Sequence, residues 1–281
     1  MNGRLQRATE ARVSIFDRGL LYGDGIFETF RIYNGRPFLL KDHLRRLQRS
    51  ARSIGLRLPH SAGWFHRQMA AVLTANHLPD AIVRLTITRG IGPAGLDPPA
   101  AVRPTVILVA RPFTGYSDMR ISRGLSVVIA GIRRAPPSAV PPHAKSLNYL
   151  IGILAKREAS SRGADDALLL SSDGQLCEGT TSNLFFVRDG VLYTPSPRTG
   201  LLEGITRQVI LHLALRLKIP VRQGLFLPRE LQTADELFLT NTSYEIMPVT
   251  RVEGRRIGTG RPGPLTRRLH REFQRSIQRF Q

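Results

Sequence analysis

Lysine and cysteine are both scarce in this chain of 281 residues. The single cysteine, Cys177, excludes internal disulfides and cysteine-rich metal sites, which fits a reducing compartment. Only four of the 41 lysine and arginine residues are lysines: Lys41, Lys145, Lys156 and Lys218. An amine can lose its proton near neutral pH and attack a carbonyl, whereas a guanidinium cannot. A lysine kept in so arginine-rich a chain is therefore a candidate for chemistry that needs an amine.

Long hydrophobic runs and paired metal ligands are also missing from the sequence. No window approaches the ~18 uninterrupted apolar residues of a membrane span, and the N-terminal residues lack the apolar core of a signal peptide. None of the seven histidines forms a close pair at metal-ligand spacing. We therefore expect a soluble, cytoplasmic protein without a metal centre and without a membrane partner.

Negative charge is in short supply too, and the formal net charge is +20. A chain this basic could bind nucleic acid through its phosphates. The arginines, however, are scattered along the chain, and no zinc-finger spacing, RNP-like aromatic pattern or basic-zipper heptad occurs. We expect no specific nucleic-acid partner, and an arginine-rich nucleic-acid-binding protein stays a distant alternative.

The first part of the chain alternates predicted strands and helices around a glycine-rich loop at 17–25. Asp42 is expected to cap the first helix, in which Leu44 and Leu47 recur at helical spacing. The strand at 104–110 is almost wholly apolar and is expected to be central in its sheet. The predicted elements here are strands at 13–16, 26–33, 81–89 and 104–110, and helices at about 40–54 and 62–76.

The length of the chain favours two lobes. A polar stretch without periodicity, 114–124, is the expected linker between a small N-terminal α/β domain, 1–113, and a larger C-terminal domain, 125–281. The order of elements predicts an α/β (or α+β) fold with mixed sheets. The elements predicted in the second part are strands at 125–132, 166–171, 184–187, 236–240 and 247–252, and helices at about 147–161, from 204 onward and at the C-terminus.

Three segments carry candidate chemistry. Lys145 lies in a proline-rich stretch, 141–150, and is either a surface lysine or a nucleophilic amine. The segment 200–207 is a glycine-flanked loop that runs into a helix, so its free backbone N–H groups either suit a phosphate or merely begin the helix. Glu178 lies in a polar segment between two apolar strands, where its carboxylate either faces solvent or holds a protonated heterocycle.

Taken together, these segments resemble the class IV aminotransferases, the fold-type IV enzymes that depend on pyridoxal 5'-phosphate (PLP). The family pattern runs from a glutamate through an asparagine and a hairpin to a helix start. The matching residues are Glu178, Thr180, Asn183-Leu184-Phe185, Leu192-Tyr193-Thr194 and 202–207, with further family-like segments at 21–28, 43–47 and 145–150. The resemblance covers about residues 12–250 and implies a two-lobed fold in which the C-terminal domain binds PLP.

The resemblance also implies roles for individual residues. Lys145 would be the lysine that forms the Schiff base with PLP and later moves the proton at the substrate Cα. Glu178 would pair with the pyridine nitrogen and keep it protonated, so that the ring accepts electrons. The remaining cofactor-binding residues would be Tyr149 on the phenolic oxygen, Leu202 against the ring, and Arg46, Ile205, Thr206 and Thr242 at the phosphate.

Transamination in ping-pong fashion, between an amino acid and a 2-oxo acid, is the activity that the resemblance favours. Substrate-binding candidates are Tyr22, Phe27, Arg31, Arg84, Arg89 and Ser243. Arg84 matches a strand position of branched-chain aminotransferases, and Arg89 matches the carboxylate-binding position of D-amino acid aminotransferases. Phe27 stands where the latter tend to carry a tyrosine, so the substrate stays open between branched-chain-like and D-amino acids.

A second activity of the same family stays open as the alternative. In 4-amino-4-deoxychorismate lyases the same cofactor serves to eliminate pyruvate and give 4-aminobenzoate, and segments 27–31 and 145–157 also resemble such lyases. The family resemblance further implies a homodimer with active sites where the two lobes meet.

Overall fold

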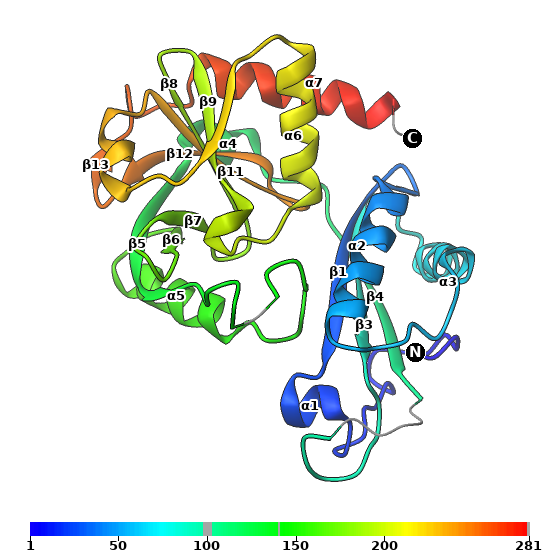
Figure 1. The fold of residues 1–281 in the computed structure, drawn as a ribbon. Coiled ribbons are helices and arrows are strands. Elements are labelled where there is room, and N and C mark those ends of the chain that lie inside the picture. Colours follow the sequence, from blue (N-terminus) through cyan, green and yellow to red (C-terminus); the bar gives the residue numbers. More distant parts are fainter. Residues whose placement is uncertain (98–102, 140, 280–281) are drawn as a thin grey trace. The chain divides into compact units, whose positions relative to one another are not determined.

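The computed structural model describes residues 1–97, 103–139 and 141–279, and its elements are labelled in Figure 1. The chain forms two compact units, each described below by itself. The first consists of Met1–Thr114 together with His143–Asn148, and the second of Gly115–Pro142 together with the chain from Tyr149 onward. The short segment that carries Lys145 thus belongs to the first unit although it lies far along the chain.

The first unit is an antiparallel sheet with two helices against it. Its strands lie in the order β2-β1-β3-β4. The helix α2 packs on β1, and α3 packs on β4 (Figure 1). The elements are α1 (Arg18–Tyr22), β1 (Gly25–Tyr33), β2 (Arg36–Pro37), α2 (Leu40–Ser53), α3 (Ala62–Ala75), β3 (Ala81–Thr88) and β4 (Thr105–Pro112).

The register of β1 against β3 decides which residues face the helices. Ile26 pairs with Ile87, and Phe30 with Val83, and all four are buried in one apolar cluster with the inner faces of α2 and α3. Since side chains alternate along a strand, Glu28 points to this helix-covered face, whereas the odd-numbered residues of β1 point to the other. A carboxylate is thereby placed inside an apolar core.

Three expectations for this unit are wrong. Residues 13–16 form no strand, and the expected loop at 17–25 contains α1, capped by the side chain of Asp17. Asp42 lies in the first turn of α2 and pairs with Arg45, whereas the N-cap position is Leu39. The strand β4 lies at the edge of its sheet. Its apolar composition reflects the packing of α3 on one face of the strand and not a central position in the sheet.

The second unit contains a sheet that closes on itself. Strands follow one another in the order β8-β11-β12-β5-β6-β7, and β7 pairs with β8 again through Glu178 and Asn183. The pairs β12–β5 and β5–β6 are parallel and the others in this circuit antiparallel, as a mixed sheet requires. The strands β9 and β10 extend the sheet beyond β8, and β13 pairs with β12.

The elements of this unit confirm most of the predicted ones, although the strands β7, β9, β10 and β13 and the helix α4 were not among them. The strands are β5 (Leu125–Arg133), β6 (Asp166–Leu170), β7 (Leu176–Gly179), β8 (Asn183–Arg188), β9 (Val191–Pro195), β10 (Val221–Gly224), β11 (Glu236–Asn241), β12 (Glu245–Val252) and β13 (Arg255–Arg256). The helices are α4 (Asp118–Arg123), α5 (Leu150–Ser161), α6 (Ile205–Arg216) and α7 (Pro264–Arg279), with short 3-10 turns at Pro197–Thr199 and Pro228–Thr233.

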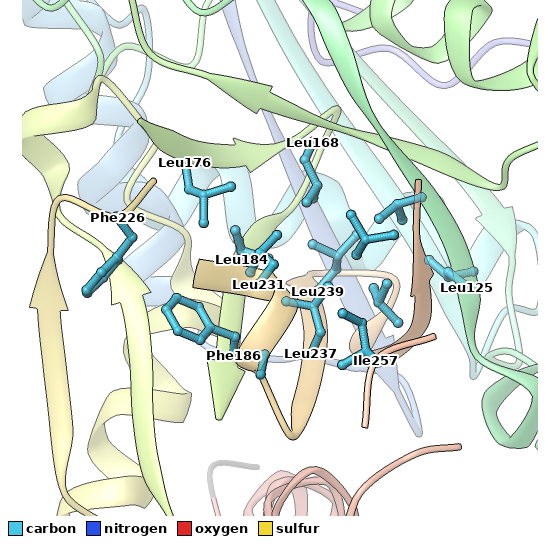
Figure 2. Packing of buried hydrophobic residues seen from close by; sticks show 14 of the residues in the cluster. Leu125, Leu168, Leu176, Leu184, Phe186, Phe226, Leu231, Leu237, Leu239 and Ile257 are labelled. Atoms are coloured by element: carbon cyan, nitrogen blue, oxygen red, sulfur yellow. The ribbon is translucent and has the colours of Figure 1, made fainter. Parts of the chain in front are cut away.

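The closed sheet encloses an apolar core. Side chains from β5, β6, β7, β8 and β11 point into a common space in Figure 2, among them Leu125, Leu168, Leu176, Phe186 and Leu239. Full burial of side chains of this size stabilises a fold by about 1.5–3 kcal/mol each. The alternate residues of β5 and β6 are small or aliphatic and pack under α5 instead. Alternation along these strands therefore builds both layers of the unit.

Two negative findings concern the described part of the chain. None of its helices combines the length and apolarity that crossing a membrane would need. It also contains no group of three or more histidine, cysteine, aspartate or glutamate residues that could hold a metal ion.

Candidate active site

Lys145 is held in the first unit by strand-like pairing. The Lys145 carbonyl accepts a hydrogen bond from Phe27 N at 3.0 Å, and Leu147 N donates to the Gly25 carbonyl at 3.0 Å. A further bond runs from Lys145 N to Ser50 Oγ on α2, at 3.0 Å. The lysine amine lies 4.5 Å from the centre of the Phe27 ring. Backbone bonds thus fix a half-buried amine against an aromatic face.

Two of the substrate-binding candidates accompany this lysine. Phe27 points to the face of β1 that α2 does not cover, and the guanidinium of Arg84 stacks on its ring at 3.7 Å. Arg84 Nε also donates to Thr86 Oγ1 at 3.3 Å, and the side chain remains exposed. The structure therefore brings together an amine, an aromatic ring and an exposed cation.

The other two arginine candidates are enclosed by partners of their own. Arg31 is 3% exposed, donates to the carbonyls of Ala81 and Phe113, and lies 3.8 Å from Asp80. These contacts tie it to the end of the sheet.

Arg89 is equally enclosed, by the turn that follows α2. Its guanidinium donates to Asp24 Oδ2 at 2.7 Å and to the carbonyls of Ile54 and Gly55 at 2.6 and 3.1 Å. Tyr22, at the end of α1, is exposed, and its hydroxyl accepts a hydrogen bond from Gly95 N at 3.2 Å. The hydrogen bonds of Arg89 therefore all go to residues of its own unit.

Arg46 belongs to a buried charged cluster with Glu28 and His43. Arg46 Nε lies 2.7 Å from Glu28 Oε1 and Arg46 Nη2 lies 2.8 Å from Glu28 Oε2, a two-pronged ion pair. His43 Nδ1 lies 2.8 Å from Glu28 Oε2, and the three side chains are 0%, 2% and 4% exposed for Glu28, His43 and Arg46. Glu28 and His43 lie in the family-like segments 21–28 and 43–47, but the sequence assigned neither a role, although a glutamate on the apolar face of a strand is a usable signal.

The pKa values in this cluster follow from burial and pairing. Burial opposes ionisation of Glu28, but the Arg46 guanidinium and the His43 ring outweigh it and hold the pKa of the carboxyl well below its ordinary value. Burial lowers the pKa of His43 more than Glu28 raises it. The cluster therefore holds an ionised carboxylate, a guanidinium and a neutral imidazole at neutral pH.

Glu178 is the corresponding fixed carboxylate of the second unit. It lies on β7 and is 8% exposed. Its Oε1 is 3.1 Å from Arg134 Nε, and its Oε2 accepts a hydrogen bond from Leu202 N at 3.0 Å. A carboxylate has about four acceptor sites, so a glutamate is the right type of group to accept a bond from a ring N–H. Arg134 was not anticipated, because one arginine among so many carries no signal.

Asn183 connects Glu178 to the start of α6. It pairs with Glu178 across β7 and β8, and its Nδ2 donates to the Leu202 carbonyl at 2.8 Å. A Cβ on Gly204 would lie 2.1 Å from Asn183 Oδ1, so glycine is needed for this close approach. The side chain of Asn183 thus sets the path of the loop that leads into the helix.

The helix α6 begins in a way that leaves its first N–H groups available. Gly204 is its N-cap and supplies no side-chain hydrogen bond. Ile205 and Thr206 follow as the first two helical residues, and both side chains are buried. The first N–H groups of a helix have no partner within it and lie at its positive end. This helix start can therefore hold an anion.

The turn after β11 lies beside Asn183. Thr240 pairs with Asn183 across β11 and β8, and the Thr240 hydroxyl is buried without a hydrogen-bond partner among the described residues. Asn241 Oδ1 accepts from Ser243 N at 2.9 Å, from Ser243 Oγ at 3.2 Å and from Tyr244 N at 2.6 Å. Thr242, between them, is half-buried. Tyr149 lies in the same unit, at the N-cap position of α5.

These features of the second unit fit a phosphorylated pyridine. The uncapped start of α6 suits a phosphate. The Thr240 hydroxyl on β11 is buried without a hydrogen-bond partner among the described residues. Glu178 offers a fixed acceptor for a protonated ring nitrogen. The residues named from the sequence thus divide between the units. Lys145, Arg46, Tyr22, Phe27, Arg31, Arg84 and Arg89 lie in the first, and Tyr149, Glu178, Leu202, Ile205, Thr206, Thr242 and Ser243 lie in the second.

Comparison with known proteins gives consistent matches over nearly the whole chain. The family model "Amino-transferase class IV" matches residues 25–252. A putative branched-chain-amino-acid aminotransferase of Methanocaldococcus jannaschii is 40% identical, over 98% of this chain and 94% of its own. A D-alanine aminotransferase of Bacillus licheniformis is 36% identical, over 98% and 95%.

The fold is similar to that of a solved relative. The crystal structure of a branched-chain amino acid aminotransferase from Escherichia coli matches with a TM-score of 0.93 and 34% identity, covering 97% of this chain and 92% of the other. This likeness confirms the expected mixed-sheet, fold-type IV architecture.

Proposed function

The chain belongs to the class IV aminotransferases, and from this premise we propose that it uses PLP to move an amino group between an amino acid and a 2-oxo acid in ping-pong fashion. The observation that carries the proposal is the amine of Lys145, which backbone pairing with β1 holds over the Phe27 ring. When bound, PLP supplies an aldehyde that takes up an amine and a ring that draws electrons from the substrate Cα.

In this proposal each residue acts through a group seen above. The Lys145 amine would hold the cofactor by an imine link to its aldehyde carbon, with release of water, and would take and return the proton at the substrate Cα. Glu178, oriented by Arg134, would accept a hydrogen bond from the ring N–H. The first N–H groups of α6, with Thr206, Thr242 and Arg46, would bind the phosphate.

Tyr149 donates to the phenolic oxygen in this scheme, and Leu202 packs on the ring. Among the substrate-binding candidates, Arg84 is the one whose guanidinium is exposed and stacked on Phe27, so we assign it the substrate carboxylate. Tyr22 and Ser243 remain proposed pocket residues. The proposed domain limits, 1–113 and 125–281 with a linker at 114–124, and the cytoplasmic location stay predictions.

Borohydride reduction tests the central assignment. Reduction of the protein with its cofactor should attach the pyridoxyl group to Lys145, as read by peptide mass spectrometry, and Lys145→Ala should abolish turnover while the protein still folds. Lys156→Ala, a change to an exposed lysine of α5, is the matched control and should keep its turnover. Attachment to Lys41, Lys156 or Lys218 would refute the assignment.

Substrate class is tested separately, because the relatives include a branched-chain-amino-acid aminotransferase and a D-alanine aminotransferase by name. We propose a branched-chain-like or D-amino acid as amino donor. The purified protein is incubated with L-leucine or D-alanine plus 2-oxoglutarate, and in parallel with 4-amino-4-deoxychorismate alone. Rapid 4-aminobenzoate release without any 2-oxo acid would replace transamination by the lyase activity.

We also propose that two copies of the chain associate. The first unit exposes an apolar surface in which Ile15, Phe16, Leu20, Ile91 and Leu96 are each at least 60% exposed, and surfaces of this kind mark interfaces. Sedimentation should show a dimer that Phe16→Asp combined with Leu20→Asp dissociates. Met119→Asp, at an 80% exposed apolar residue of the second unit, is the control and should leave the dimer intact.

A further inference from the structure

A cavity of about 650 Å³ opens on the first unit between α2, α3 and the connection between them. Its lining runs from Leu40 to His66 and includes none of the residues assigned to catalysis, cofactor or substrate. The volume lies within the range of about 300–1,000 Å³ that is typical of small-molecule sites. The surface is therefore large enough to bind a ligand of its own.

The floor of this cavity is apolar. Leu44 and Leu47 come from α2, Leu56 from the connection and Phe65 from α3, and all four are buried. Leu58 adds a half-buried side chain between the two helices. The four buried side chains already lie out of water, so the apolar surface that a ligand can still cover belongs to the half-buried Leu40 and Leu58 and the exposed Ala62. A ligand gains about 25 cal/mol for each Å² of that surface covered.

The rim of the cavity is basic. Lys41, Arg45, Arg52 and Arg57 line it and are exposed, whereas no aspartate or glutamate is among its lining residues. Arg45 is paired with Asp42 at 3.1 Å. Within the described ranges no ion pair joins Lys41, Arg52 or Arg57 to an acid, so these cations repel one another and favour an anion.

We propose that this cavity binds a medium-chain aliphatic carboxylate, with its chain on the leucine and phenylalanine floor and its carboxylate among the rim cations. Both halves of the surface are needed for this choice. An inorganic anion would leave the apolar surface of Leu40, Leu58 and Ala62 in water, and an uncharged chain would leave the rim cations without an anion. The site is separate from the proposed transamination, and its occupancy does not depend on that function being right.

The chain carries a built-in reporter for this site. Trp64 is its only tryptophan, and its ring stacks on His60, a lining residue, with the ring centres 3.6 Å apart. Decanoate is titrated, below its micellar concentration, into the cofactor-containing protein while Trp64 emission is followed, and calorimetry measures the binding heat directly. We expect saturable one-site binding that weakens as salt is added.

Charge-reversed variants test the rim. Arg52→Glu with Arg57→Glu should weaken decanoate binding about tenfold or more, because two attractions become repulsions. Arg49→Glu with Arg67→Glu changes the net charge equally at exposed arginines of α2 and α3 that do not line the cavity, and should bind nearly as the parent does. Decyltrimethylammonium, with the same tail and the opposite charge, should not bind.

Several results would overturn the proposal. Equal decanoate affinity in the two double variants would show that the rim cations have no role in binding. Equal binding of decyltrimethylammonium and decanoate would show that the surface binds apolar chains without regard to charge. No decanoate binding at all, together with a change of oligomeric state in Arg52→Glu/Arg57→Glu, would instead make this surface an interface between copies of the chain. Aminotransferase activity of the variants is measured in parallel. Its presence or absence does not change how the decanoate-binding results are interpreted.

Discussion

The change Glu28→Gln addresses the buried cluster of the first unit with a single atom replacement. It keeps the shape of the side chain but removes its charge, and it replaces one acceptor oxygen with an NH2 donor that cannot accept a bond from the Arg46 guanidinium. Arg46, which is 4% exposed, then loses the carboxylate that lies 2.7 and 2.8 Å from its nitrogens. Breaking a buried ion pair by neutralising one partner destabilises a protein by about 3–5 kcal/mol. Because whole domains are stable by only about 5–15 kcal/mol, this loss is large.

Two companion variants separate the lost pairing from general damage. Asp42→Asn removes the exposed Asp42–Arg45 pair on the same helix, which is worth about 0–1 kcal/mol. Glu28→Met combined with Arg46→Met removes both buried charges and should recover much of the loss, since apolar replacement of a buried pair is often near neutral. Urea unfolding followed by circular dichroism gives the free energies, and hydrogen exchange of α2 reports the local effect.

The pH dependence provides an independent check. The pKa of Glu28 is depressed in the folded state, so its stabilising effect is present above the unfolded-state value of about 4.3 and is lost as pH falls through the folded-state value. The stability difference between the parent and Glu28→Gln should therefore be constant near neutral pH and should shrink below about pH 4. A difference under about 1 kcal/mol at pH 7, or one that grows on acidification, would refute the reasoning.

Three further predictions concern the second unit. Glu236→Gln should destabilise the protein by about 1–2 kcal/mol and raise exchange at the start of α7, because this carboxylate accepts three hydrogen bonds from the first residues of that helix. Glu272→Gln removes only the pair of the half-buried Glu272 with the exposed Arg275 on the same helix and should change stability by less than about 0.5 kcal/mol. Burial raises the pKa of Cys177 to about 12, so a thiol reagent at pH 8 should modify it only on unfolding, and rapid labelling of the native protein would contradict that burial. Gly204→Ala should weaken PLP binding about tenfold, measured by absorbance titration, since the new Cβ displaces Asn183 at the helix start; Gly174→Ala, in an open turn, should not change it.

Much of this architecture was predictable because periodicity reports burial. The alternation in β1 and the helical spacing of Leu44 and Leu47 gave the right element types, and both residues face the core. Composition alone was a poorer guide to position within a sheet, as β4 illustrates. The apolar residues on one face of β4 pack against α3. The sequence does not show whether β4 has a second neighbouring strand in its sheet.

The candidate site was predictable only where a motif fixes local geometry. The run from Gly200 to Arg207 correctly gave a helix start without a side-chain cap. The partners that fix charged groups were not predictable, because they come from distant parts of the chain: Arg134 reaches Glu178 across 44 positions in the sequence. Arginine is too common in this chain for any one position to stand out.

The pairing of the Lys145 segment with the edge of β1 has a consequence for inherited changes in chain length. Ile26 bridges Ser146, and neighbouring residues of a strand point to opposite faces, so the register of two backbone hydrogen bonds decides the side on which the lysine emerges. Replacing a residue in 143–148 leaves that register intact. Inserting or deleting one there would turn the amine away from the Phe27 ring without altering a single catalytic group. Lineages of this enzyme should therefore tolerate substitutions in the segment far better than single-codon insertions, and gains or losses of length should fall before residue 143, among the prolines of 136–142.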